Sequence, residues 1–200
     1  SLKSAEMQAA SQSVNGAEGF WNTLDQVAAN PSTAAHLLLE SLFPMLAGGV
    51  AARGLQALGA GVKLATAAGE GAIMAGSSAE QIRGQTLDKR LSLKQSLAAA
   101  TTGVMGGAVA RLSGGASGRL GLGDIDEAIT KGTLGTSQRG VLARTGGATA
   151  FESAEEGLQS TGETMLENFA LDRGLTEGVG NAAALGMVTG AAMGAPMGLA

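Results

Sequence analysis

The sequence predicts an all-α protein in which Gly- and Ala-rich helices pack through faces of small residues. Gly supplies 33 of the 200 residues and aromatic residues only 2%, so few side chains are large enough to anchor a conventional core. Ala, Leu, Met, Gln, Glu and Lys favour helix, and no segment shows the apolar alternation of a strand. We expect a chain that is extended rather than compact and is stabilised by oligomerisation, because contacts between small residues must replace bulky side chains.

Residues 1–30 are expected to form two short helices. The first spans about residues 3–14, and the second follows Gly16 and spans residues 17–29. The second helix ends before Pro31, because a proline disfavours the helical conformation of the residue before it.

Residues 31–112 contain the apolar, small-residue helices. A segment over residues 34–76 reads as helix and is expected to break or kink at Pro44, which lacks a backbone donor. The polar stretch 77–90 is interpreted as a connector with a short helical piece. A further helix is expected over residues 92–112, with a serine at its start as the N-cap.

Residues 113–137 are interpreted as a Gly/Ser linker with a short helix at 124–130, because Gly and Ser cluster there. Residues 138–200 then form an acidic helix over 138–171, followed by a last helix over 176–199. The second of these carries the glycine repeat described next.

Small residues recur every fourth position near the C-terminus, which keeps them close to one side of a helix. They are Gly178, Ala182, Gly186, Gly190, Gly194 and Gly198. Such a groove lets another helix approach closely, and we predict that these residues pack helices together. Residues 178–200 carry no charge over 23 positions, which is also long enough to cross a hydrocarbon core. The alternative is a flexible tail whose spacing arose by chance.

Shorter stripes of the same kind occur upstream. They are Ala57, Gly61, Ala65 and Gly69, then Ala68, Ala72 and Gly76, and finally the pair Gly103 and Gly107. The uncharged runs around them are too short to span a bilayer, so interfacial or protein-buried helices are predicted there.

The net charge of −4 conceals a basic middle and an acidic end. Residues 83–144 carry 9 basic and 4 acidic side chains, whereas residues 145–200 carry 1 basic and 7 acidic. The basic part has three possible roles: it forms solvated or intermolecular ion pairs, it binds nucleic acid non-specifically, or it binds anionic lipid. The candidate phosphate or ion-pair contacts are Arg83, Lys89, Arg90, Lys94, Arg111 and Arg119.

No catalytic, cofactor or metal site is predicted, and no small-molecule substrate is expected. The chain has no Cys and one His, His36, so thiol chemistry and multi-histidine metal sites are excluded. Glycines between residues 114 and 123 lack the Gly-Lys-Ser/Thr ending of a phosphate loop and are interpreted as a loop. An acidic set is interpreted as a solvated or partner-facing stripe, and it comprises Glu152, Glu155, Glu156, Glu163 and Glu167.

One segment resembles a known class of protein. It contains Phe151-Glu-Ser-Ala-Glu155-Glu156-Gly157-Leu158-Gln159, then Glu163, Leu166-Glu167-Asn168, Arg173-Gly174, Glu177-Gly178-Val179 and the small-residue helix. It resembles a module of the large internal virion proteins of short-tailed bacteriophages and of related polyvalent phage proteins. The resemblance covers residues 150–200, whereas residues 34–112 share only its Gly/Ala-rich texture. Since the chain begins with Ser1, we expect it to be a piece of a larger protein.

The resemblance implies a role in DNA ejection, without enzymatic activity in this segment. Such proteins lie in the virion interior and form a conduit across the host envelope on infection. The implied partners are further copies of the chain, other ejection, portal or tail proteins, non-specific DNA and the host membrane. A tail tape-measure protein or another interior virion structural protein is the first alternative. A membrane-active pore-forming protein is the second.

Overall fold

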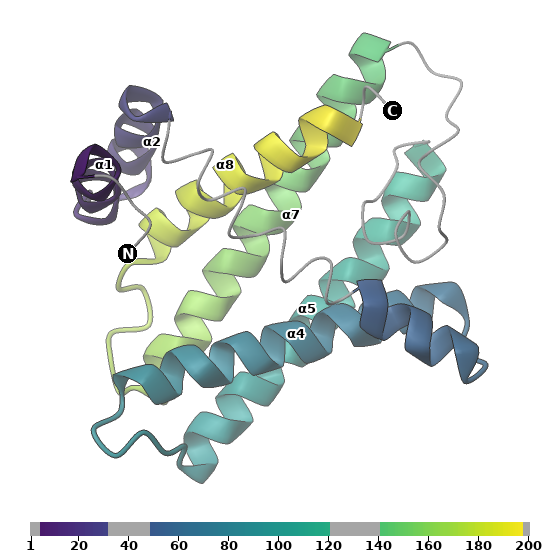
Figure 1. Cartoon of the computed structure of the whole chain (residues 1–200), viewed down its shortest axis with the longest axis horizontal. Coiled ribbons are helices and arrows are strands. Elements are labelled where there is room, and N and C mark those ends of the chain that lie inside the picture. The colour runs from purple at the N-terminus through teal and green to yellow at the C-terminus, as the bar shows by residue number, and fades with distance from the viewer. Residues whose placement is uncertain (1–4, 32–48, 121–140, 198–200) are drawn as a thin grey trace.

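A computed structural model describes residues 5–31, 49–120 and 141–197 (Figure 1). Within these ranges the secondary structure is helical and contains no strand, so the all-α prediction is confirmed there. Residues 49–57 form a short helical piece. The other helices are α1 (Ala5–Asn15), α2 (Phe20–Ala29), α4 (Val62–Gln85), α5 (Leu93–Leu120), α7 (Val141–Ala170) and α8 (Val179–Met197).

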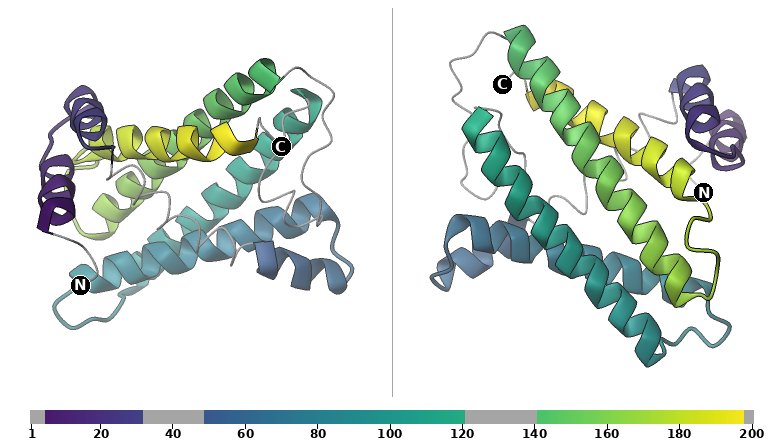
Figure 2. Two further views of the ribbon diagram at one scale, coloured as in Figure 1. Left: turned by 45° about the horizontal axis from the view of Figure 1, so that its top comes forward. Right: turned by 180° about the vertical axis from the view of Figure 1, so that it is seen from behind.

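The four long helices form two hairpins that lie against each other. α4 packs on α5, α7 packs on α8, and the hairpins meet where α5 runs beside α7. In Figure 1 α4 and α8 lie toward the viewer, and from behind α5 and α7 lie in front (Figure 2). The described long helices therefore make two layers, with α4 and α8 in one and α5 and α7 in the other. α2 packs against α8.

Glycines bring the backbones of α4 and α5 into direct contact. A Cβ atom added to Gly71 would lie 2.5 Å from the carbonyl oxygen of Gly103, and one added to Gly107 would lie 2.6 Å from that of Ala67. These distances are shorter than any van der Waals contact allows, so a side chain at either position would force the helices apart. The contact thus depends on the absence of side chains.

The buried interior is correspondingly poor in large side chains. A cluster of Ile82, Ala98, Ala99 and Ala170 joins the ends of α4, α5 and α7. Nearby, the buried hydroxyls of Ser78 and Thr102 lie 3.3 Å apart across α4 and α5 and share a hydrogen bond. The fully buried side chains of largest volume are Ile82, Val14, Thr23, Thr102 and Ser78.

Four helices predicted from the sequence are confirmed with small shifts of their ends, namely α1, α2, α7 and α8. The predicted break at Pro44 and the helix at 124–130 lie outside the described residues. The prediction of one helical segment over 34–76 is wrong at residues 58–61, where the chain turns at Gly59 with φ +93°.

Two predicted connectors are wrong over part of their length. Residues 77–85 continue α4, because Ser78 and Ile82 lie on its buried side and pack against α5. Residues 113–120 continue α5, so the glycines at 114, 115 and 118 lie in a helix and not in a loop. Gly and Ser lower helix propensity by about 1 kcal/mol or less, which tertiary packing readily outweighs.

Gly71→Ala is expected to destabilise the chain, whereas Gly76→Ala in the same helix is expected to stabilise it. The first substitution forces α4 away from α5 and should lower the free energy of unfolding by about 1–3 kcal/mol. The second adds a methyl group where no atom lies within 4 Å, and should raise that free energy by about 0.5–1 kcal/mol. Urea unfolding followed by circular dichroism measures both, and equal shifts for the two variants would contradict the proposed role of Gly71.

Candidate functional site

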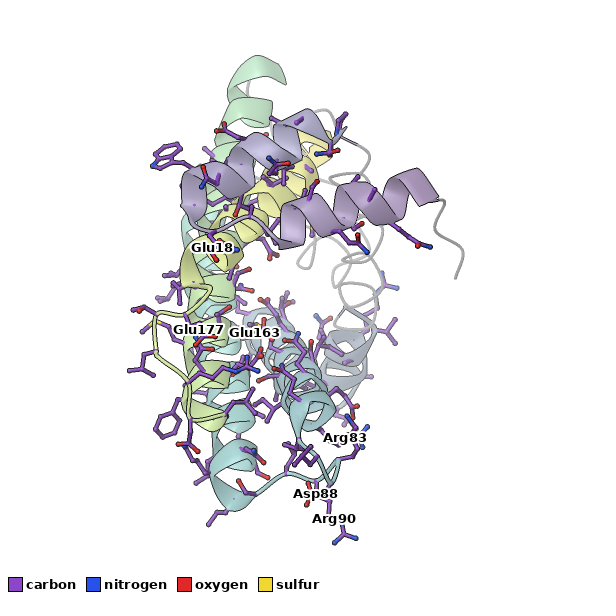
Figure 3. The ribbon with its side chains drawn as sticks, turned by 90° about the vertical axis from the view of Figure 1, so that its left-hand side faces the viewer. Glu18, Arg83, Asp88, Arg90, Glu163 and Glu177 are labelled. Carbon is purple, nitrogen blue, oxygen red and sulfur yellow. The ribbon has the colours of Figure 1, made fainter. Side chains whose placement is uncertain are left out.

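α7 turns a row of carboxylates toward the interior of the molecule. Glu152, Glu156, Glu163 and Glu167 are spaced by four, seven and four residues, which keeps them on one side of the helix. We call these four residues the inner acidic row. In Figure 3 Glu163 lies on the side of α7 that faces α4. The opposite side of α7 carries exposed large apolar residues, so this helix is polar inside and apolar outside.

Burial changes the ionisation of two members of the row. Burial raises the pKa of Glu156 from 4.5 to about 7. The pKa of Glu163 also rises to about 7, through burial first and then through repulsion by Glu167 and Glu156. The interpretation of these glutamates as a solvated or partner-facing stripe is therefore wrong for these two. At Glu156 the cause is visible, because Gly186 of α8 lies directly against the Glu156 carbonyl group and lets α8 pack closely over α7.

Hydrogen bonds to neighbouring helices satisfy much of this polar interior. The buried Gln159 side chain donates through Nε2 to Glu70 Oε1 of α4 at 2.9 Å and to Glu155 Oε1 at 3.2 Å. Glu167 Oε1 accepts from Gln85 Nε2 of α4 at 2.5 Å. Glu163 Oε1 is buried and accepts no hydrogen bond from the residues that the structure describes.

The glycine repeat of α8 contacts α7 of the same chain. A Cβ atom added to Gly186 would collide with the carbonyl oxygen of Glu156, and one added to Gly190 with that of Glu152. A Cβ at Gly157 of α7 would lie 2.6 Å from Met187 Cγ. The groove expected to receive a neighbouring helix is thus filled within one chain over this stretch.

The other residues of the repeat lie in different surroundings. Gly194 is buried and Ala182 is half-buried. Gly178 precedes α8 in an exposed turn with φ +68°, a conformation that glycine adopts without strain. Gly198 lies outside the described residues.

Only some residues of the predicted upstream stripes lie in helix contacts. Gly103 and Gly107 do so in α5, and they meet Ala67 and Gly71 of α4, which belong to none of the predicted stripes. The predicted stripe of Ala68, Ala72 and Gly76 is exposed. Gly and Ala are so frequent in α4 that several registers look alike in the sequence.

No described helix is both long enough and apolar enough to cross a membrane. α8 has 19 residues, and its Gly residues together with Asn181 and Thr189 keep its hydropathy low. The run of 23 uncharged positions is long enough to cross a bilayer, but the described part of α8 is not apolar enough to do so.

Three of the six candidate basic residues contact groups of the same chain. Lys94 Nζ lies 2.5 Å from Asp172 Oδ1 and 4.6 Å from the centre of the Phe169 ring. Arg83 pairs with Glu80 at 2.5 Å, and Lys89 donates to the carbonyl oxygen of Gly84. The Lys94 ion pair joins the basic middle to the acidic end within one molecule.

The remaining basic candidates are not brought together. Arg90 is exposed in the turn after α4, close to Asp88 (Figure 3). Arg111 is exposed on α5, and the side chain of Arg119 lies outside the described residues. The described side chains among these positions do not form a continuous basic surface.

Two asparagine side chains, which the sequence did not indicate as important, bond to the turns before α2 and before α8. Asn181 Oδ1 accepts from the backbone N–H of Gly19 at 2.7 Å, and its Nδ2 donates to the carbonyl oxygen of Ala17. The buried Asn168 donates through Nδ2 to the carbonyl oxygen of Glu177 at 2.7 Å. Asparagine side chains bond readily to backbone groups, but no pattern in the sequence indicates that Asn181 meets residues 17 and 19.

A hollow of about 630 Å³ lies where the turn between α4 and α5 meets the end of α7. Gln85, Arg90, Ser92 and Asp172 are among its lining residues. The start of α5 is already capped, because Ser92 Oγ accepts from Gln95 N–H and Gln95 Oε1 accepts from Ser92 N–H. Ser92 and Gln95, which line the hollow, are thus bonded to each other and do not point to a ligand there.

Among the described residues no three His, Cys, Asp or Glu side chains are placed to hold a metal ion. His36 lies outside them. Comparison with known proteins adds no assignment, since no family model, curated protein or solved structure matches this chain.

Ionisation of Glu156 and Glu163 is expected to destabilise the fold as pH rises. The folded state holds these protons up to a pKa of about 7, whereas a carboxyl at its ordinary value releases them near 4.5. Between those pH values the folded state binds more protons, so the free energy of unfolding falls as pH increases. Glu163→Gln should raise that free energy by about 1–3 kcal/mol at pH 8 and flatten its decline.

Urea unfolding at about pH 5 and pH 8 measures this effect. Glu177→Gln is the matched control, because Glu177 is exposed in the turn before α8. An unchanged pH dependence in Glu163→Gln would show that its carboxyl group ionises freely in the folded chain.

Gly190→Ala is expected to loosen the contact of α8 with α7 and lower the free energy of unfolding by about 1–3 kcal/mol. Its new Cβ atom would collide with the backbone at Glu152. Gly146→Ala is the control, because no atom lies within 4 Å of a Cβ added there. Thermal unfolding compares the two, and a Gly190→Ala variant as stable as Gly146→Ala would contradict close packing at Gly190.

Proposed function

We propose that this chain is a non-enzymatic structural segment of a phage ejection protein. It would form part of an oligomeric internal core or of a trans-envelope conduit for the genome. Its location is then the virion interior, and the host cell envelope on infection. The resemblance of residues 150–200 to internal virion proteins suggests this role.

The observation that carries the proposal is that helices pack by backbone contact with few large buried side chains. Gly71 against Gly103 in one hairpin, and Gly186 and Gly190 against α7 in the other, illustrate it. A chain that passes through a narrow tail must unfold and refold, and each large buried side chain adds roughly 1.5–3 kcal/mol to the resistance against unfolding. Small-residue contacts restore the helical pairs without a bulky core that must be taken apart first.

The polarity of α7 supports assembly. Glu156 and Glu163 lie inside, whereas the large apolar residues Leu158, Met165 and Phe169 lie outside. This is the reverse of a helix in a solitary soluble domain. Oligomerisation would cover those side chains and give the extended arrangement expected from the composition. The proposed partners are copies of this chain and other ejection, portal or tail proteins. Non-specific DNA and the host membrane are further partners of such a conduit.

Mass spectrometry of purified particles tests this function. Peptides from this chain are expected in full particles of the phage that encodes it, and they should be depleted at least about tenfold from particles that have released their DNA. Peptides of the major capsid protein, which stays behind, are the control. Equal amounts of the chain in full and emptied particles would overturn the ejection role, and its absence from both would overturn a virion role altogether.

A further inference from the structure

The outward side of α5 carries large apolar side chains along its described length. Leu93, Leu97, Val104 and Leu112 are 77%, 59%, 74% and 75% exposed. Their spacing keeps them on one side of the helix, which is turned toward solvent. α5 is therefore apolar on both sides, which is typical of a helix that has neighbours on both.

α7 extends this surface. Leu158, Met165 and Phe169 are 61%, 38% and 50% exposed, and their spacing of seven and four residues keeps them on one side. The Phe169 ring lies under the Lys94 ammonium group of α5, so the two exposed rows adjoin. Seen from behind, α5 and α7 lie side by side in front of α4 and α8 (Figure 2). We call these seven apolar residues of α5 and α7 the outer apolar face.

The outer apolar face is large enough for a stable dimer. The described side chains of these helices lie within residues 93–112 of α5 and 146–170 of α7. With a rise of 1.5 Å per residue and a width of about 10 Å, these two stretches present roughly 700 Å². Specific protein interfaces bury about 600–1,000 Å² on each partner.

The composition of the face selects its occupant. Its cations are Lys94, which is paired with Asp172, and Arg111, so it offers nucleic acid no row of phosphate contacts. The net charge of −4 disfavours an anionic lipid surface. The small exposed residues Ala100 and Ala108 alternate with the large ones on α5, which leaves depressions that the side chains of an identical face fit.

We propose that the outer apolar face binds the same face of a second copy of this chain in a two-fold contact. In such a contact each exposed leucine or valine of one copy packs beside small residues of the other, and Lys94 keeps its partner Asp172. The inference deepens the proposed function and rests on it for the purpose of the assembly. The contact itself follows from the described surface.

Sedimentation equilibrium of the 200-residue chain tests the contact. The wild type is expected to form dimers, and Leu97→Glu or Val104→Glu should weaken dimerisation by about tenfold to a hundredfold, because each buries a carboxylate in the contact. Leu58→Glu is the control, since Leu58 is 86% exposed in the turn before α4, away from the face. Circular dichroism should show the same helicity in all variants, because the substituted side chains are already exposed.

Each outcome decides the inference. A wild type that stays monomeric, or oligomers that Leu97→Glu and Val104→Glu leave unchanged, would overturn it. Flotation with neutral phosphatidylcholine vesicles tests whether the face binds lipid instead. A chain that does not self-associate, but floats with the vesicles and loses this binding in Leu97→Glu, would show a lipid contact and overturn the proposal. Failure of the proposed function looks different, since dimers in solution together with absence of the chain from virions would overturn only the function.

Discussion

The contact between helix backbones at glycine positions is the constraint on which the rest of the structure depends. In both hairpins a missing side chain on one helix makes room for a carbonyl group of the other, as at Gly71 with Gly103 and at Gly190 with Glu152. Such contacts are short-ranged and depend on register, so they fix which residues face each other. They also leave little volume between the paired helices, so larger side chains do not fit there and lie elsewhere.

Large side chains lie outside because small ones occupy the inner faces. On α5 the inner side holds Ala99, Thr102 and Gly103. The described leucines of the same helix, Leu93, Leu97 and Leu112, are consequently exposed. On α7 the inner side carries carbonyl groups and carboxylates against the glycines of α8. The outer surface of these two helices therefore has the composition of a core, and this is the reason for proposing that a second copy of the chain covers it.

Long helices with a regular small-residue repeat could be predicted from the sequence, whereas the register of their contacts could not. α7 and α8 were expected nearly as they are, because a turn at residues 172–174 separates two uninterrupted helical patterns. The continuation of α4 through residues 77–85 was missed, since it depends on Ser78 meeting Thr102 of another helix. Gly and Ala recur so often that the stripe of Ala68, Ala72 and Gly76 looked as suitable as the contact at Gly71.

The inner acidic row was misjudged for a related reason, and it bears on how the two hairpins hold together. Nothing local in the sequence distinguishes Glu163 from a solvated glutamate, because its burial arises from helices distant along the chain. Within each hairpin the close contacts at glycines involve no ionisable group and do not change with pH. Glu156 and Glu163 lie on the side of α7 that also bonds to α4 of the other hairpin through Gln159 and Glu167. They lose their protons near neutral pH at a cost in free energy. The backbone contacts are therefore the firm part of each hairpin, and the side of α7 that faces α4 of the other hairpin is the place where rising pH weakens the chain first.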